Sequence, residues 1–207
     1  MLTPKLIISF TYIARICNPC QQKKLTMKKL FITFICLLPF IGFSQFKAKY
    51  KAMEQIENPS FTDYDELVYE ATSYIFSNPV NSKSEEFLYA VKIAQFWMNK
   101  DTEFGMPIFG AFHTKLTKEN NQKFFYVIAM MHYNLIQKME KNRVIKFVKV
   151  EGVKFSDLPE VQEIQLEGAK ILLNYAKQKE NNFPLNSDMQ VYIEANENGT
   201  LKEVLFK

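Results

Sequence analysis

Cysteine, glycine and proline are scarce in this 207-residue chain, and each shortage excludes a kind of site. The three cysteines, Cys17, Cys20 and Cys36, all lie within the first 44 residues. The remainder can therefore form neither a disulfide framework nor a cysteine-ligated zinc site. It also holds only five glycines and five prolines, which argues against a glycine-rich phosphate loop and against a disordered linker.

Histidine is scarcer still, with only His113 and His132 in the whole chain. The sequence has no His-Glu-x-x-His pair and no Gly-x-Ser-x-Gly elbow. The acidic pairs (Asp63 with Asp65, Glu85 with Glu86, Glu160 with Glu163) fall in the opening turns of predicted helices, where the helix dipole explains them. We therefore predict no catalytic residue, no metal and no cofactor.

Acidic residues are absent from the first 44 positions, which carry six basic side chains. The whole chain has 26 basic and 22 acidic residues, a net charge of +4, so residues 45–207 have 20 basic and 22 acidic residues, a net charge of −2. Their lysines at 138–154 are interleaved with apolar residues and with Glu140 and Glu151. This pattern indicates a solvated face rather than a phosphate track, and we expect no nucleic-acid partner.

Residues 27–44 have the pattern of a signal peptide. Lys28 and Lys29 form a positive start, an apolar run of h-region length follows, and Gly42 and Ser44 place small side chains at −3 and −1. We predict cleavage between Ser44 and Gln45. A retained N-terminal anchor is the alternative; a lipoprotein is disfavoured because Cys36 lies inside the apolar run without a lipobox.

Residues 1–26 precede this signal and have no evident role. We interpret them as a mis-assigned upstream start, with translation beginning at Met27, or else as a long n-region. Cys17 and Cys20 have thioredoxin-like spacing, but no second cysteine pair exists and the segment precedes the cleavage site. A redox or zinc role is therefore not expected. We predict an exported protein, periplasmic rather than extracellular, with no membrane span in the mature chain.

Residues 45–61 are polar and lysine-rich, and we expect an extended or frayed lead-in. Residues 62–207 then form one helical domain, because apolar residues recur at helical spacing. Stretches of this kind run over 62–78, 84–99, 107–116, 120–141, 156–181 and 187–198, with a last apolar turn at 201–206. We predict an all-α fold of five to six helices in antiparallel hairpins, either a bundle or tetratricopeptide-like.

Two parts of this fold stay open. Residues 143–155 are rich in valine and partly alternate with lysine, which fits a short strand, a hairpin or an ordered loop. The segments 62–99 and 107–141 could be two stacked helix pairs, although the small and aromatic positions of a 34-residue repeat do not recur.

Aromatic residues are concentrated in one third of the chain. Core packing explains most of them, and the functional alternative is a groove between helices for an apolar molecule or a partner's segment. The candidate binding residues are Trp97, Phe104, Phe109, Phe112, His113, Tyr126, His132 and Tyr133. A histidine site would need His113 or His132 beside a carboxylate such as Glu119 or Glu140; the other interpretation is that His132 is a partly buried, hydrogen-bonded histidine.

Four segments carry a resemblance to a known group: Gly42-Phe43-Ser44-Gln45, Phe96-Trp97-Met98, the tyrosine-rich long helix, and Ile193 to Leu201. Together they resemble small secreted helical proteins common in flavobacteria and their relatives. The resemblance covers most of residues 27–207 and implies export and an all-helical fold. The group has no assigned activity, so it supplies no catalytic residue.

Three hypotheses follow for function. The favoured one is an exported, non-enzymatic helical binding or scaffold protein of the bacterial cell envelope, with an envelope protein or an apolar small molecule as partner. The alternative is an enzyme that uses His113 or His132 with a nearby carboxylate. The third is a carrier of an apolar ligand in the aromatic cluster at 97–133.

Overall fold

The computed structural model describes residues 45–57, 60–100 and 102–207. Within them the chain forms eight α-helices, several short 3₁₀ turns and no strand, so the predicted all-α class is confirmed. The predicted signal peptide, the cleavage site at Ser44 and the Cys17–Cys20 pair lie outside the described residues. None of the described helices is both long and apolar enough to cross a membrane.

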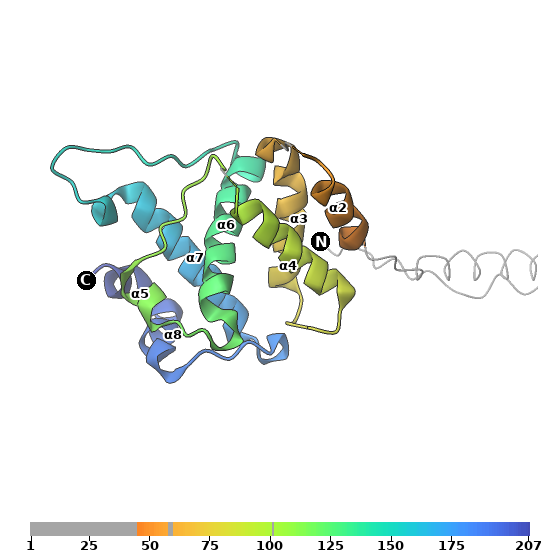
Figure 1. Cartoon of the computed structure of the whole chain (residues 1–207). Coiled ribbons are helices and arrows are strands. Elements are labelled where there is room, and N and C mark those ends of the chain that lie inside the picture. Colours follow the sequence, from red (N-terminus) through yellow and green to blue (C-terminus); the bar gives the residue numbers. More distant parts are fainter. Residues whose placement is uncertain (1–44, 58–59, 101) are drawn as a thin grey trace, which may run out of the picture. The chain divides into compact units, whose positions relative to one another are not determined.

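The longest helix, α6 (Gln122–Lys141), lies at the centre of the domain, between α3 (Asp65–Ser77) and α7 (Pro159–Lys177) (Figure 1). Ten of its side chains are buried. A helix that is apolar on nearly every side is typical of the middle of a bundle, as its sequence predicts.

Helix α4 (Glu85–Met98) packs against α3 and makes a hairpin with it. Ser84 caps α4 as predicted, because its Oγ accepts a hydrogen bond from the Phe87 amide at 3.2 Å. The proposed pairing within 107–141 is not the main one, since α6 packs chiefly against α7 and α3. The chain ends in α8 (Gln190–Glu197) and α9 (Leu201–Leu205), which pack on each other and on α7.

Residues 45–54 are helical, so the expectation of an extended or frayed lead-in is wrong. They form α2 (Gln45–Glu54), which packs on α4 and buries Phe46 and Met53. Phe46, Tyr50 and Met53 stand at i, i+4 and i+7, which is helical spacing. The lysines between these apolar residues make the segment polar on average, so its composition does not indicate a helix with an apolar face.

The helix expected from Pro107 begins later, as α5 (Gly110–Lys115). The side-chain amide of Gln165 donates to the carbonyl oxygens of Pro107 and Phe109, both at 3.0 Å. These two carbonyl oxygens therefore accept hydrogen bonds from a side chain of α7, whereas in a helix they would accept them from backbone amides. Gly110 has a φ of +94°, a conformation that favours glycine and separates this segment from the helix.

Residues 143–155 form the ordered-loop alternative, with no strand among them. Ile145 is buried and Phe147 packs against the core, which anchors the start of the loop. Val148, Val150 and Val153 are exposed. A hairpin would need a packed face to stabilise it, and these valines have none.

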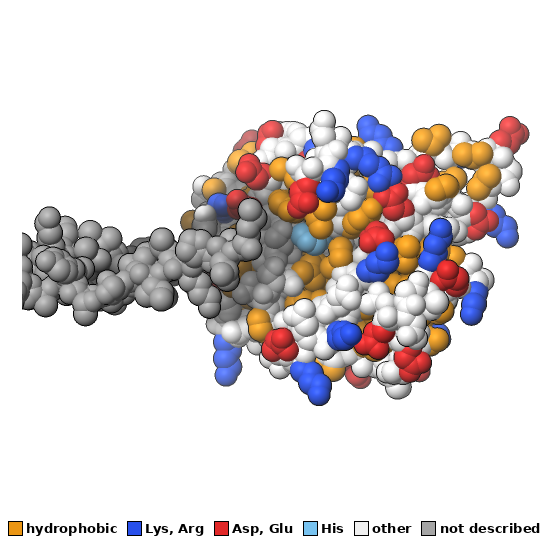
Figure 2. Space-filling model, turned by 180° about the vertical axis from the view of Figure 1, so that it is seen from behind, with side chains coloured by type: hydrophobic (Ala, Val, Ile, Leu, Met, Phe, Trp, Pro, Cys, Tyr) orange, Lys and Arg blue, Asp and Glu red, His pale blue; other side chains and the backbone are white. Residues whose placement is uncertain are grey.

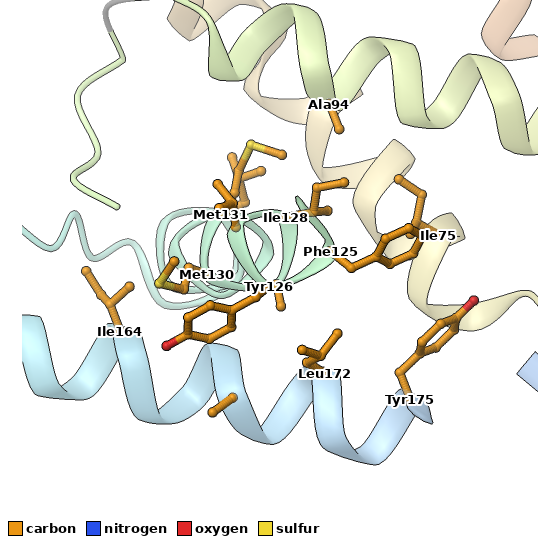
Figure 3. Packing of buried hydrophobic residues seen from close by; sticks show 14 of the residues in the cluster. Ile75, Ala94, Phe125, Tyr126, Ile128, Met130, Met131, Ile164, Leu172 and Tyr175 are labelled. Atoms are coloured by element: carbon orange, nitrogen blue, oxygen red, sulfur yellow. The ribbon is translucent and has the colours of Figure 1, made fainter. Parts of the chain in front are cut away.

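Helices α6 and α7 are in close contact at Gly168. A Cβ atom there would lie 2.5 Å from Met130 Cγ and 3.1 Å from the Met130 backbone nitrogen. Figure 3 shows Met130 and Tyr126 of α6 directed toward α7, which carries Ile164 and Leu172. The Tyr126 hydroxyl donates to the Gln165 carbonyl at 3.1 Å and satisfies its only polar atom within this apolar contact.

Candidate functional site

Of the aromatic residues predicted as one cluster, four belong to the same buried core and Tyr133 packs against it, but their nearest ring and polar contacts differ. Trp97 is buried, and its indole nitrogen donates to the Asp65 carboxylate at 3.2 Å. Lys138 donates to the same carboxylate at 2.5 Å and also to Glu103. Phe104 lies on the Trp97 ring, with centroids 5.6 Å apart. This group joins α3, α4 and α6 around a partly buried ion pair.

A second group surrounds Tyr126. Phe112 contacts the rings of Tyr126 and Tyr192 at 4.9 and 5.0 Å, and all three residues are buried. His113 is near the same tyrosine, with a centroid distance of 6.4 Å. Burial, and next the charge of Lys123, lower the pKa of His113. These residues fill the space between α5, α6 and α8.

Phe109 and Tyr133 each have their own partners, which differ from those of the Trp97 group and the Tyr126 group. Phe109 contacts Phe155 at the end of the 143–155 loop, with centroids 5.8 Å apart. The Tyr133 hydroxyl donates to Glu163 at 2.6 Å, and Glu163 pairs with Arg143 at 2.5 Å. The hydrogen bond from Arg143 is the main reason why the pKa of Glu163 is lowered. Tyr133 therefore helps to fix the C-terminal end of α6 to α7.

Only His132, of the eight predicted binding residues, lines the groove that α3, α6 and α7 form together. This groove has a volume of about 420 Å³, within the range of small-molecule sites. Its walls combine rings, aliphatic side chains and polar groups. The lining residues are Tyr69, Ser73, Phe76, Ser77, His132, Ile136, Glu140, Ile171, Asn174, Tyr175 and Gln178.

Four rings make a continuous wall along this groove. Tyr69 is stacked on His132 with centroids 5.9 Å apart, and Phe76 follows at 5.7 Å from His132. Tyr175 meets Phe76 edge-on at 5.5 Å. The Tyr175 hydroxyl donates to the Asn78 carbonyl at 2.7 Å, and burial raises its pKa to about 12. The wall is thus held at both ends by packing and hydrogen bonds.

His132 is neutral near pH 7, because burial lowers its pKa to about 4. Its Nδ1 lies 2.9 Å from Thr72 Oγ1, and that hydroxyl also lies 2.9 Å from the Val68 carbonyl oxygen. Which of the two atoms donates in the contact between Thr72 and His132 depends on the tautomer of the imidazole.

Glu140 gives the groove its negative charge. It accepts a hydrogen bond from the Tyr69 hydroxyl, and this contact is the main reason why the pKa of Tyr69 is raised. Among the described residues, no lysine or arginine lines the groove. With His132 neutral, this described lining carries a net charge of −1 from Glu140.

The two histidines are in different surroundings, because His113 packs beside Tyr126 and is not part of the groove. Glu140 does share the groove with His132, which is one of the pairings that the histidine hypothesis requires. No cluster of three or more His, Cys, Asp or Glu side chains in the described part of the chain could hold a metal ion.

Most of the groove lies outside the predicted aromatic cluster. On α3, the apolar stripe Leu67, Val68, Ala71 and Ile75 conceals a second stripe, Tyr69, Ser73 and Phe76, at i, i+4 and i+7. That spacing is the signal that could have indicated a second contact face. Tyr175 comes from α7, 99 residues after Phe76, and the sequence does not show that the two meet.

The face drawn in Figure 2 carries basic and acidic side chains in mixture, with hydrophobic side chains exposed between them. Comparisons with protein-family models, with curated proteins and with solved structures find no match to this chain. The resemblance to secreted flavobacterial proteins therefore stays a prediction.

Proposed function

We propose that this chain is an exported, non-enzymatic helical binding protein of the bacterial cell envelope, and that the α3–α6–α7 groove is its binding site. The observation that carries the proposal is the groove itself, with its wall of four rings and a carboxylate at one end. Rings supply large contact area at low entropic cost, and the polar groups supply orientation.

The groove's chemistry favours a ligand that donates hydrogen bonds and carries positive charge. Glu140 is an acceptor, and none of the described residues that line the groove is basic, so none of them repels a cation. Tyrosine and phenylalanine faces attract an ammonium group, by about 0.5–2 kcal/mol depending on its desolvation. The ligand class is therefore a small amine with a flat apolar body, its ammonium beside Tyr69 and Glu140 and its body along Phe76 and Tyr175.

Three probes of nearly equal size test this proposal: 2-phenylethylamine, 2-phenylethanol and phenylacetate. In titrations of the purified protein followed by NMR, we expect the amine to bind most tightly and to shift the signals of α3, α6 and α7. Glu140→Gln should weaken amine binding about tenfold, which corresponds to about 1.4 kcal/mol. The matched control is Glu119→Gln, an exposed carboxylate outside the groove.

The outcomes separate the two parts of the proposal. If none of the three probes perturbs the groove, the binding site is wrong. If all three bind equally and Glu140→Gln has no effect, the groove binds ligands but the amine class is wrong.

One observation favours the enzyme hypothesis as a second candidate: His132 and Glu140 line the same groove. The low pKa of His132 makes it a weak base, and its Nδ1 is engaged by Thr72. Turnover of a bound amine, detected as a new product by mass spectrometry and abolished in His132→Gln, would support an enzyme. The third hypothesis, an apolar ligand in the 97–133 cluster, is tested by mass spectrometry of ligands retained after native purification.

A further inference from the structure

Glu86 lies where the N-termini of two helices meet. It belongs to the first turn of α4, and its Oε1 accepts a hydrogen bond from the Phe46 amide of α2 at 3.2 Å. The first backbone N–H groups of a helix have no acceptor within the helix, so Glu86 serves as a cap for α2 from another element.

The other oxygen of the Glu86 carboxylate, Oε2, is buried and lacks a hydrogen-bond donor among the described residues. An unpartnered buried oxygen of this kind is unusual and calls for a donor. The sequence supplies one, because Gln45 directly precedes Phe46 and is the residue that follows the predicted cleavage site.

We propose that the carboxylate of Glu86 binds the α-ammonium group that cleavage creates at Gln45. This inference rests on the proposed export and on cleavage after Ser44. Hydrolysis of the Ser44–Gln45 peptide bond replaces a single amide donor with a charged group that has three donors. The Gln45 nitrogen precedes the Phe46 nitrogen in the chain at the start of α2, and the Phe46 amide donates to the same carboxylate.

The neighbouring carboxylates already form ion pairs with lysines, so Glu86 is the proposed partner of the ammonium group. Glu85 pairs with Lys47 at 2.7 Å, and Glu70 of α3 pairs with Lys49 at 2.5 Å. The titratable rings nearby are those of Tyr74, against Phe46, and of Tyr89, beside Lys47. No ion pair involves Glu86 within the described residues. An ammonium group at a helix N-terminus also opposes the helix dipole, and a carboxylate offsets that repulsion.

If this ion pair forms, cleavage of the leader adds a stabilising interaction to the folded domain. The α-ammonium should be held in its charged form, because the neighbouring carboxylate raises its pKa above the ordinary 7.7–8.0. The stability that it contributes is present below that ordinary value and is lost as the pH rises through the raised value.

The test uses protein purified from the periplasm of producing cells. N-terminal sequencing and intact mass should show a chain that starts at Gln45 with a free amine. The pKa of that amine, followed by the ¹³Cα shift of Gln45, should be raised in the wild type and ordinary in Glu86→Gln. At pH 6.5, Glu86→Gln should raise the unfolding equilibrium constant about tenfold. At pH 10 the increase should be smaller, because the amine is then neutral in both proteins.

Glu85→Gln is the matched control, with the same charge change one residue away in an exposed pair; we expect less than a threefold change. A chain that starts elsewhere would overturn the cleavage proposal and this inference with it. A start at Gln45 with an ordinary amine pKa would overturn this inference alone. Loss of one ammonia from the intact mass would show that Gln45 has cyclised, which also excludes the ion pair.

Discussion

At the scale of single residues, the buried neutral imidazole of His132 links the stability of the fold to pH. Its pKa is about 4 in the folded chain, against an ordinary value of 6.5. The unfolded chain therefore binds more protons between these values, and acidification favours unfolding. The stability that neutral His132 contributes is fully present above pH 6.5 and is lost as the pH falls to about 4.

We expect His132→Gln to flatten this dependence. The wild type should lose about 3 kcal/mol more of its unfolding free energy than the variant between pH 6.5 and pH 4. Urea denaturation at several pH values measures the difference, and the carboxylates common to both proteins cancel. His113→Gln is the control, because the pKa of His113 is also lowered but without the large shift that His132 has. Parallel profiles for wild type and His132→Gln would refute the assignment.

At the scale of elements, the contact between α6 and α7 depends on a glycine. In Gly168→Ala the new Cβ would lie 2.5 Å from Met130 Cγ and within 3.2 Å of two Met130 backbone atoms. Alanine improves helix propensity by about 1 kcal/mol, but overpacking costs about 1–3 kcal/mol and the backbone of α6 cannot move aside freely. We expect a net loss of roughly 1–2 kcal/mol, measured by thermal or chemical unfolding.

The double variant Gly168→Ala with Met130→Ala tests the cause. Met130→Ala alone should destabilise by about 2–5 kcal/mol, because it empties part of the core. The double variant should lose less than the sum of the two single losses, since the alanine methyl fills space that the Met130 side chain leaves. Strict additivity would show that the two positions do not meet.

Helical elements were predictable from the sequence wherever an apolar stripe and a capping residue occur together. Ser84 and the run before Lys141 are examples, and both place their helices to within two residues. Prediction failed where tertiary contacts decide. In α2, the lysines between the apolar residues conceal the apolar stripe. A helix was expected to begin at Pro107, but the side chain of Gln165 instead hydrogen-bonds to the Pro107 carbonyl.

The candidate site shows the same division. His132 could be named from the sequence because histidine is so rare there. The whole wall could not be named, because only long-range packing brings Tyr175 of α7 to Phe76 of α3 and His132 of α6 to Tyr69. The concentration of aromatic residues at 97–133 reflects the core instead.

At the scale of the whole molecule, net charge would distinguish the predicted precursor from the predicted exported form. The chain from Met1 carries +4 and has an isoelectric point near 8.8. A chain from Met27 keeps only Lys28 and Lys29 of the six N-terminal basic residues and has 22 basic and 22 acidic groups, a net charge of 0. A chain from Gln45 carries −2. The three products are thus distinct in charge as well as in mass.

Isoelectric focusing of the translation product and of the exported protein therefore tests both the start site and the cleavage. We expect a near-neutral precursor, which indicates translation from Met27, and an acidic exported form. Gly42→Arg places a large charged side chain at −3 and should leave a precursor that does not become acidic. A precursor that focuses near pH 8.8 would place the start at Met1, and an exported form with the precursor's own isoelectric point would show that the leader is retained. Residues 45–207 carry −2 in every form, but the whole chain is acidic only without its leader, so only in that form would the net charge of the protein attract an amine as Glu140 does.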